Sequence, residues 1–221
     1  MAEENTMFLD SSRLADVIVQ LESIFSKLNE LLFESKLSKP VITVASNGRR
    51  KNVLGWCSTV KVWLGDGARC YYEINICAEF LNRDIIEICG TIIHEMVHLL
   101  NAENDILDCS RHGYYHNGKF KKAAEEHGLF VEKMGTYGYA ATSLMPKTEQ
   151  SIKSLGLDKF TLYRDPLYAQ GNGQEDGQES GQANAKQSTR KYACPSCHTI
   201  IRATRSVNVH CVDCDFDFIA L

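Results

Sequence analysis

The sequence lacks the features that direct a protein into a membrane or out of the cell. Residues 1–7 are acidic and contain no apolar core of a signal sequence, so we expect no secretion. No apolar run is both long enough and free enough of charge to cross a bilayer, so we expect no membrane partner. Together these absences predict a cytoplasmic protein.

A strong excess of positive charge is also missing. The chain has 24 Lys and Arg residues against 28 Asp and Glu residues, which gives a net charge of -4 at pH 7. Bulk electrostatics therefore do not indicate a nucleic-acid binder, although they leave room for a local basic patch.

A disulfide framework is not indicated either, although the chain has nine cysteines. Four of them form two C-x-x-C pairs near the C-terminus. An odd scatter of single cysteines without a signal sequence favours free thiols in a reducing compartment. We interpret the scattered cysteines as small buried hydrophobic residues. They are Cys57, Cys70, Cys77, Cys89 and Cys109.

The most informative motif that is present is H-E-x-x-H, at residues 94–98. It lies in a run, residues 85–100, that is apolar on nearly every face, as is typical of a helix in a protein core. Three ionisable groups in such a helix are costly unless something satisfies them. His94 and His98 point from one helical face and can bind a single zinc ion. Glu95 lies beside them and can accept a proton from a metal-activated water molecule.

A catalytic zinc usually takes three protein ligands and a water molecule, so the chain needs a third ligand. The metzincin spacing requires a histidine six residues after His98, where this chain has Asn104, and that family is excluded. His116 has the best setting, because it follows a polar, glycine-containing loop and immediately precedes a helix predicted at residues 118–127. The alternatives that stay open are His112, Glu125 and Glu126.

The segments around these histidines resemble the SprT-like metallopeptidases, a family with bacterial, phage and Spartan-related members. In that family the third histidine lies in a loop and is followed four positions later by an aromatic residue, as His116 is followed by Phe120. The resemblance covers roughly residues 10 to 145. It is carried by TIIHEMVH at residues 91–98, Ser110-Arg111, and HNGKF at residues 116–120.

One difference from the family pattern keeps His112 open as a ligand. The third histidine of the family is often followed directly by glycine. Here Gly113 follows His112, whereas Asn117 follows His116.

The resemblance implies an α+β fold with a zincin-like metallopeptidase domain that acts on a protein substrate. It implies His94, His98 and His116 as ligands of a catalytic zinc, and Glu95 as the general base. It also implies a link to DNA, since Spartan-type members cleave proteins that are crosslinked or bound to DNA.

Three short β-prone runs precede the H-E-x-x-H helix, at residues 41–45, 53–64 and 71–77. We expect the last of them to pair with an extended substrate, as edge strands do in peptide recognition. We expect Asn82 to cap the helix. Residues 129–144 predict one irregular strand.

The C-terminal part of the sequence predicts a separate metal module. Residues 169–190 contain almost no apolar side chain and predict a flexible linker between a metallopeptidase domain, 1–168, and a small unit, 191–221. Two C-x-x-C knuckles in that unit predict a zinc ribbon with a structural zinc, whose binding supplies most of the folding energy. We expect the run 199–209 to form a small hairpin between the knuckles. The predicted ligands are Cys194, Cys197, Cys211 and Cys214, with His198 and His210 as alternatives.

The sequence therefore favours a zinc-dependent endopeptidase with one catalytic and one structural Zn²⁺. Its partners would be a protein substrate and DNA, the latter through basic residues of the ribbon such as Arg202 and Arg205. The alternative is a non-catalytic zinc-binding adaptor that recruits a protein or a nucleic acid. Intact Glu95 favours the enzyme, because a scaffold needs the histidines but has no use for a carboxylate beside them.

Overall fold

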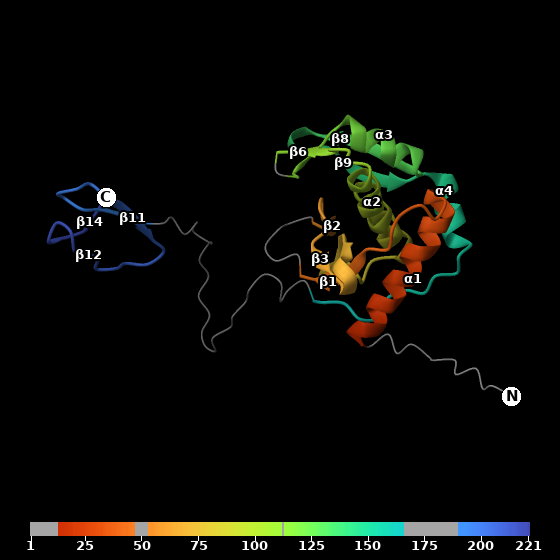
Figure 1. Cartoon of the computed structure of the whole chain (residues 1–221), viewed down its shortest axis with the longest axis horizontal. Helices are drawn as coiled ribbons and strands as arrows, with labels where there is room; N and C mark the ends of the chain where they lie inside the picture. The colour runs from red at the N-terminus through yellow and green to blue at the C-terminus, as the bar shows by residue number, and fades with distance from the viewer. Residues whose placement is uncertain (1–12, 47–52, 112, 166–189) are drawn as a thin grey trace, which may run out of the picture. The chain divides into compact units, whose positions relative to one another are not determined.

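The structure is a computed structural model that describes residues 13–46, 53–111, 113–165 and 190–221. These residues form two units, one within Met1–Gly173 and one within Gln174–Leu221 (Figure 1). The larger unit mixes helices with sheet, in agreement with the predicted α+β class. Each unit is described by itself below.

The first half of the larger unit packs one helix against a three-stranded sheet. Apolar residues at three- and four-residue steps give the helix a single buried face that includes Val17, Leu21 and Ile24. The sheet has the order β1-β5-β2, with β1 parallel and β2 antiparallel to the central strand. A two-stranded antiparallel hairpin, β3–β4, lies between β2 and β5 in the sequence. The elements of this half are α1 (Leu14–Phe33), β1 (Val41–Ala45), β2 (Gly55–Cys57), β3 (Trp63–Leu64), β4 (Cys70–Tyr71) and β5 (Glu73–Cys77).

The position of β5 corrects one expectation. Residues 71–77 were expected to pair with a substrate, but β5 has β1 on one side and β2 on the other, so neither of its edges is available. The strand at the edge of this sheet is β2.

The second half of the larger unit is a four-stranded sheet, of order β6-β7-β9-β8, with two helices. Residues 129–144 form two antiparallel strands and not the single strand expected, because Gly138, at a φ of 67°, allows the chain to turn back. The elements are β6 (Cys109–Ser110), β7 (Tyr115–His116), α3 (Gly118–Glu126), β8 (Leu129–Met134), β9 (Gly138–Leu144) and α4 (Pro146–Lys153). Single 3-10 turns occur at η1 (Asp66–Ala68), η2 (Ala78–Phe80) and η3 (Gly135–Tyr137).

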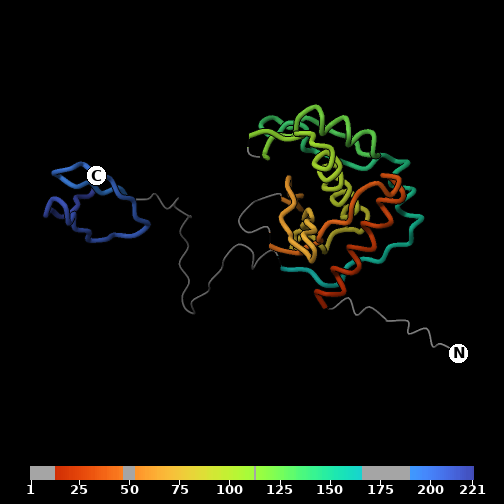
Figure 2. The backbone as a smooth tube through the Cα atoms, viewed as in Figure 1, coloured from red at the N-terminus to blue at the C-terminus, as the bar shows by residue number. Residues whose placement is uncertain are grey.

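The long helix α2 (Ile85–Glu103) lies between the two halves and contacts both (Figure 2). It packs against α1, β2 and β5 of the first half and against α3, β9 and α4 of the second. Its cap is Asp84, whose carboxylate accepts a hydrogen bond of 2.8 Å from the backbone N–H of Ile86. The expected cap, Asn82, is wrong, because helical geometry begins two residues later.

By length and composition alone, α2 is apolar enough to cross a membrane, which corrects the expectation that no such run exists. In this structure it is the core helix of the larger unit, and more than half of its most apolar window is buried. Residues Ile88, Ile92, Ile93 and Val97 are at most 2% exposed. An apolar run of this length is therefore accounted for by burial inside the protein.

The smaller unit is built from five short strands. They form a three-stranded sheet of order β11-β10-β14 and a two-stranded pair, β12–β13. The run 199–209 does not form the hairpin expected of it, because its strand, β11, pairs back with β10. The predicted linker, 169–190, lies outside the described residues except for Arg190, which begins β10. The strands are β10 (Arg190–Ala193), β11 (Ile200–Ala203), β12 (His210–Cys211), β13 (Phe216–Asp217) and β14 (Ile219–Ala220).

Candidate metal centres

Three imidazoles converge beside α2. His94 and His98 lie one helical turn apart on α2, and His116 comes from β7. The Nε2 atom of His94 lies 3.2 Å from that of His116 and 3.3 Å from that of His98, and the Nε2 atoms of His98 and His116 are 3.1 Å apart. The structure therefore brings together the three histidines that the sequence singled out.

These distances suit a shared zinc ion. Tetrahedral zinc with Zn–N bonds of about 2.0–2.1 Å holds two ligand nitrogens roughly 3.3–3.4 Å apart. His98 donates its Nδ1–H to Asp108, since a carboxylate only accepts, and His94 places its Nδ1 3.1 Å from the hydroxyl of Thr142. With the protons on Nδ1, lone pairs of Nε2 face one another, an arrangement that a cation stabilises. The donor set fits zinc.

Burial and neighbouring charges favour the ligand form of two of these rings. Burial lowers the pKa of His94 well below its ordinary value, and His98 and His116 lower it further. Burial and His98 lower the pKa of His116 to about 4. Burial also lowers the pKa of His98, but the hydrogen bond to Asp108 and the charges of Glu95 and Asp108 raise it more. A neutral imidazole is the form that binds a metal.

Glu95 lies next to the three histidines with a nearly buried side chain. Glu95 is only 5% exposed. Burial raises the pKa of Glu95 to about 7, with His98 lowering and Asp108 raising it. A carboxyl group whose pKa lies near neutrality can both accept and return a proton at physiological pH.

Hydrogen bonds around Asn117 explain why His116 reaches α2. Asn117 caps α3, because its Oδ1 accepts a 2.7 Å hydrogen bond from the backbone N–H of Lys119. Its Nδ2 donates to the carbonyl oxygen of Leu107 at 2.9 Å, and its backbone N–H donates to that of Asp108 at 2.9 Å. The residue that departs from the family's glycine is thus a helix cap that ties the preceding loop in place.

Phe120, in the first turn of α3, supports all three imidazoles. It is fully buried, and its ring centroid lies 4.7 Å from that of His94 and 4.6 Å from those of His98 and His116. The spacing of four residues between His116 and Phe120 was the sequence signal for this contact. Packing of this ring fixes the orientation of the three ligands.

Gly138 also helps to position His116, because the two residues are partners in the pairing of β7 with β9. We expect Gly138→Ala to destabilise the larger unit by roughly 1–3 kcal/mol, because φ is +67° and a Cβ would overlap the carbonyl oxygen of His116. Denaturant unfolding measures the change. Gly135→Ala in the same turn is the control, since a Cβ there meets no atom within 4 Å. Equal stabilities of the two variants would contradict this account.

The structure describes two of the three alternative third ligands, Glu125 and Glu126. Glu125 and Glu126 form ion pairs with Lys121 and Lys122 along α3, and neither joins a metal-binding group among the described residues, so the structure gives no support to the glutamate alternative. His112 lies outside the described residues.

Two neighbours of the histidines were missed by sequence reasoning. They are Thr142, on β9, and Asp108, in the loop after α2. Neither belongs to a motif with fixed spacing, so only the folded arrangement reveals them. The Nδ1 atom of His116 is buried without a hydrogen-bond partner among the described residues, although the backbone of Tyr137 lies near enough to raise the pKa of the ring.

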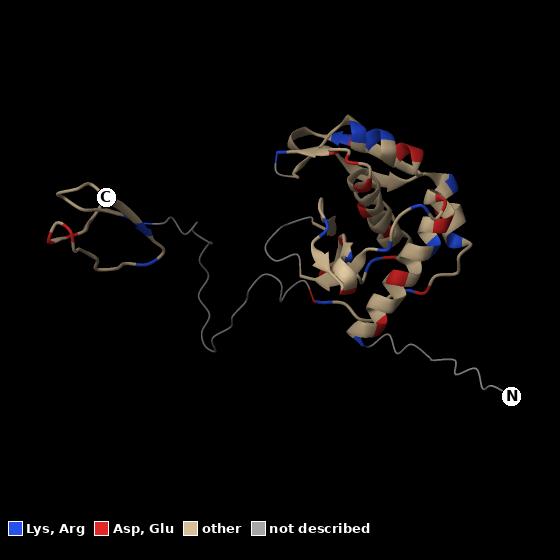
Figure 3. Cartoon of the chain, in the orientation of Figure 1, with Lys and Arg blue, Asp and Glu red and all other residues tan. Residues whose placement is uncertain are grey.

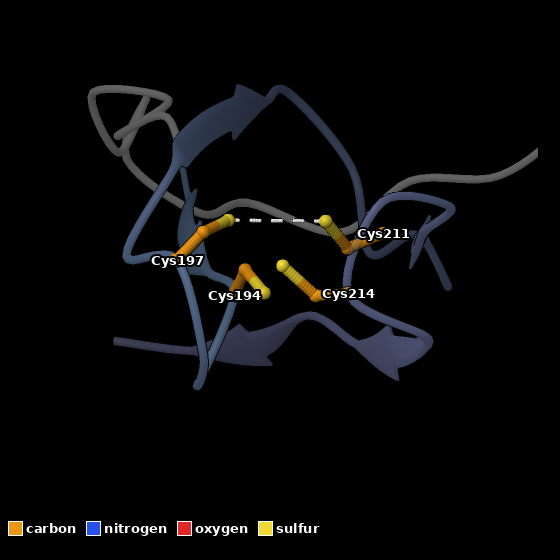
Figure 4. A group of neighbouring side chains, drawn as sticks. All are labelled: Cys194, Cys197, Cys211 and Cys214. Atoms are coloured by element: carbon orange, nitrogen blue, oxygen red, sulfur yellow. Dashed lines mark hydrogen bonds between the residues drawn. The ribbon is translucent and has the colours of Figure 1, made fainter.

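The smaller unit contains a second candidate centre, made by four cysteines. Their Sγ atoms point toward one another and all lie within 4.8 Å of each other (Figure 4). The Sγ atoms of Cys197 and Cys211 are 3.8 Å apart, which is roughly the separation that tetrahedral zinc imposes with Zn–S bonds of about 2.3 Å. The cluster comprises Cys194, Cys197, Cys211 and Cys214, the four cysteines predicted as ligands.

The thiol pKa values in this cluster diverge. Hydrogen bonds from the side chain and backbone of Thr199 lower the pKa of Cys197 to about 6, whereas burial raises the pKa of Cys211 to about 12. A thiolate at Cys211 thus needs a neighbouring positive charge, which a metal ion supplies. The alternative ligand His210 lies instead between Asp215 and Asp217, at 3.2 Å and 2.9 Å.

The α+β architecture and the three histidines beside a buried glutamate define a zincin-like domain of the zinc metallopeptidase type. The model of the SprT-like family matches residues 21–136, more than half of the chain, and the chain belongs to that family. This match confirms the resemblance seen in the sequence. No curated protein and no solved structure matches the chain.

Proposed function

We propose that this protein is a zinc-dependent endopeptidase that cleaves DNA-associated proteins, and that its C-terminal unit is a structural zinc ribbon. The observation that carries the proposal is the convergence of three Nε2 atoms, 3.1–3.3 Å apart, beside the buried carboxylate of Glu95. A binding scaffold would need the imidazoles but not a carboxylate with a pKa of about 7.

In the proposed reaction a metal ion supplies Lewis-acid activation and Glu95 transfers the proton. His94, His98 and His116 would hold the zinc ion, which would supply Lewis-acid activation of a water molecule and of the scissile carbonyl group. Glu95 accepts a proton from the attacking water on its carboxylate and later donates it to the nitrogen of the leaving amine. The low exposure of Glu95 strengthens both transfers, because bulk water does not compete for its oxygens.

The edge of β2 is the proposed binding surface for the substrate backbone. β2 pairs with β5 on one side, and no described strand pairs with its other side. Glu95 lies against this strand, since a Cβ on Gly55 would stand 3.4 Å from a Glu95 carboxylate oxygen. An extended peptide that adds to β2 would thus bring a peptide bond to the general base.

The ribbon carries the proposed contact with DNA. Lys191 of β10 and Arg202 of β11 are directly opposite each other, and both are exposed without an ion-pair partner among the described residues. Like charges placed opposite each other repel, so a phosphate between them would relieve the repulsion. Figure 3 shows basic residues at β10 and acidic residues at the far turn of the same unit. Phe216, 51% exposed, could stack on a base.

A cleavage assay with the full chain and zinc tests this function. We expect a DNA-binding protein to be cut faster when it is bound to single-stranded DNA, and a chelator to stop the cleavage. We expect Lys191→Ala/Arg202→Ala to lose the stimulation by DNA and to keep the cleavage measured without DNA. Cleavage that DNA does not change would reject the substrate class. A DNA-binding protein that stays intact under every condition would favour the adaptor.

A further inference from the structure

We propose that Asp108 is the positioning residue that fixes His98 as a zinc ligand. Its carboxylate holds the proton of His98 on Nδ1, and the lone pair of Nε2 then points to the shared site. This inference rests on the metal site of the proposed function and not on hydrolysis.

The contact between these residues is short and charged. Nδ1 of His98 lies 2.7 Å from Oδ2 of Asp108, within the range of charge-assisted hydrogen bonds. The equivalent partner of His94 is the neutral hydroxyl of Thr142, and His116 has no hydrogen-bond partner on Nδ1 among the described residues. Asp108 is therefore the one charged group, in the part of the chain described, that orients a ligand by hydrogen bonding to its other ring nitrogen.

The carboxylate is itself held in a fixed orientation. Nδ2 of Asn101, on α2, donates a 2.9 Å hydrogen bond to the same Oδ2 atom. Asp108 is 7% exposed and Asn101 2% exposed. A buried carboxylate is costly without partners. Burial raises the pKa of Asp108, but the hydrogen bond and charge of His98, together with smaller effects of Asn101 and Cys109, lower it more and favour the ionised form.

The backbone of Asp108 connects His98 to the third ligand. Its carbonyl oxygen accepts the backbone N–H of Asn117, the residue that follows His116. Cys109, the next residue, pairs with His116 across β6 and β7. One residue thus contacts His98 through its side chain and the segment of His116 through its main chain, which sets the separation of the two ligands.

A competing interpretation treats His98, Asp108 and Cys109 as a metal-binding group, because their ligand atoms lie within 4.8 Å of one another. The hydrogen bonds argue against it. Oδ2 of Asp108 already accepts hydrogen bonds from His98 and from Asn101, so it faces two donors and not a cation. We therefore interpret this group as the support of the histidine site.

Zinc titration of the full chain with ¹⁵N-labelled histidine tests the proposal, because the imidazole signals report the histidine site separately from the cysteines. In the wild-type protein we expect His98 to carry its proton on Nδ1. We expect Asp108→Ala to weaken zinc binding at the histidines by about 10–100-fold and to expose the Nδ1 proton of His98 to exchange with solvent. Asp108→Asn keeps an oxygen acceptor without the charge, so its zinc affinity should lie between those of the wild type and Asp108→Ala.

Asp105→Asn is the matched control. It removes a carboxylate from the same loop, where Asp105 is exposed and, at a φ of 54°, has a backbone conformation that Asn tolerates. Its zinc affinity should equal that of the wild type. Wild-type affinity and tautomer in Asp108→Ala would overturn the proposal. Should the Ala variant not fold, wild-type affinity in Asp108→Asn would overturn it. If zinc did not change the imidazole signals of the wild-type protein, the metal site itself would be rejected.

Discussion

Replacement of Glu95 by Gln is expected to abolish proteolysis and to leave zinc bound to the three histidines. Gln has nearly the size of Glu and can occupy the same space, but its amide cannot take up a proton from water. General base catalysis contributes typically 10²–10⁴-fold, so the rate should fall by at least about that factor. The decisive readouts are the rate of substrate cleavage and the zinc content of the same sample.

Glu87→Gln is a suitable control for that substitution. Glu87 lies on the same helix, is exposed, and precedes His94 by two helical turns. It should retain both wild-type cleavage and wild-type zinc content. If Glu95→Gln cleaved at the wild-type rate, the assignment of Glu95 as general base would be refuted. If Glu95→Gln also lost zinc, its loss of activity would be explained by the missing metal and not by proton transfer.

Removal of zinc from the C-terminal unit is expected to unfold it. Within residues 190–221 the buried side chains are those of Tyr192, Cys194 and Cys211, and two of these are predicted zinc ligands. A core of this size cannot offset the loss of conformational entropy of the chain. Zinc binding to four thiolates supplies about 10–16 kcal/mol in comparable small modules. We therefore expect a bound metal to provide most of the stability of this unit.

The double variant Cys197→Ser/Cys214→Ser tests this expectation. The full chain should bind two zinc ions and the variant one, and the variant should be digested rapidly by trypsin within residues 190–221. The melting of the larger unit should not change. Cys70→Ser is the control, because Cys70, which was expected from the sequence to be buried, is an exposed single cysteine of the larger unit. A variant that kept two zinc ions, or a trypsin-resistant C-terminal unit, would contradict the assignment of these ligands.

The parts of the site that depend on neighbouring residues could be predicted from the sequence. Residues at i and i+4 of a helix share a face whatever surrounds them, so the pairing of His94 with His98 was predicted from the motif alone, and Glu95 was predicted as part of the same motif. The four cysteines were predicted for the same reason, because each knuckle is local. The short spacing between His116 and Phe120 likewise anticipated a contact that the structure shows.

Features that depend on long-range pairing could not be predicted. β5 was expected at an edge, but the order of strands depends on which segments meet in space, and β1 and β2 enclose it. Asp108 gave no signal, since its role arises only where the loop returns to His98. The choice between His112 and His116 was also non-local, because it depends on how β6 and β7 pair.

The position of α2 has a consequence for the order of assembly. Of its residues only Glu87 is exposed, so the helix has no face that it could present to water alone. Elements of both halves of the larger unit pack against it. A fragment containing either half would leave a strip of aliphatic side chains uncovered and prone to aggregate. The second half of the larger unit must therefore pack against α2 before its two histidines can meet His116 of β7, so we expect the metal site to form only after this packing.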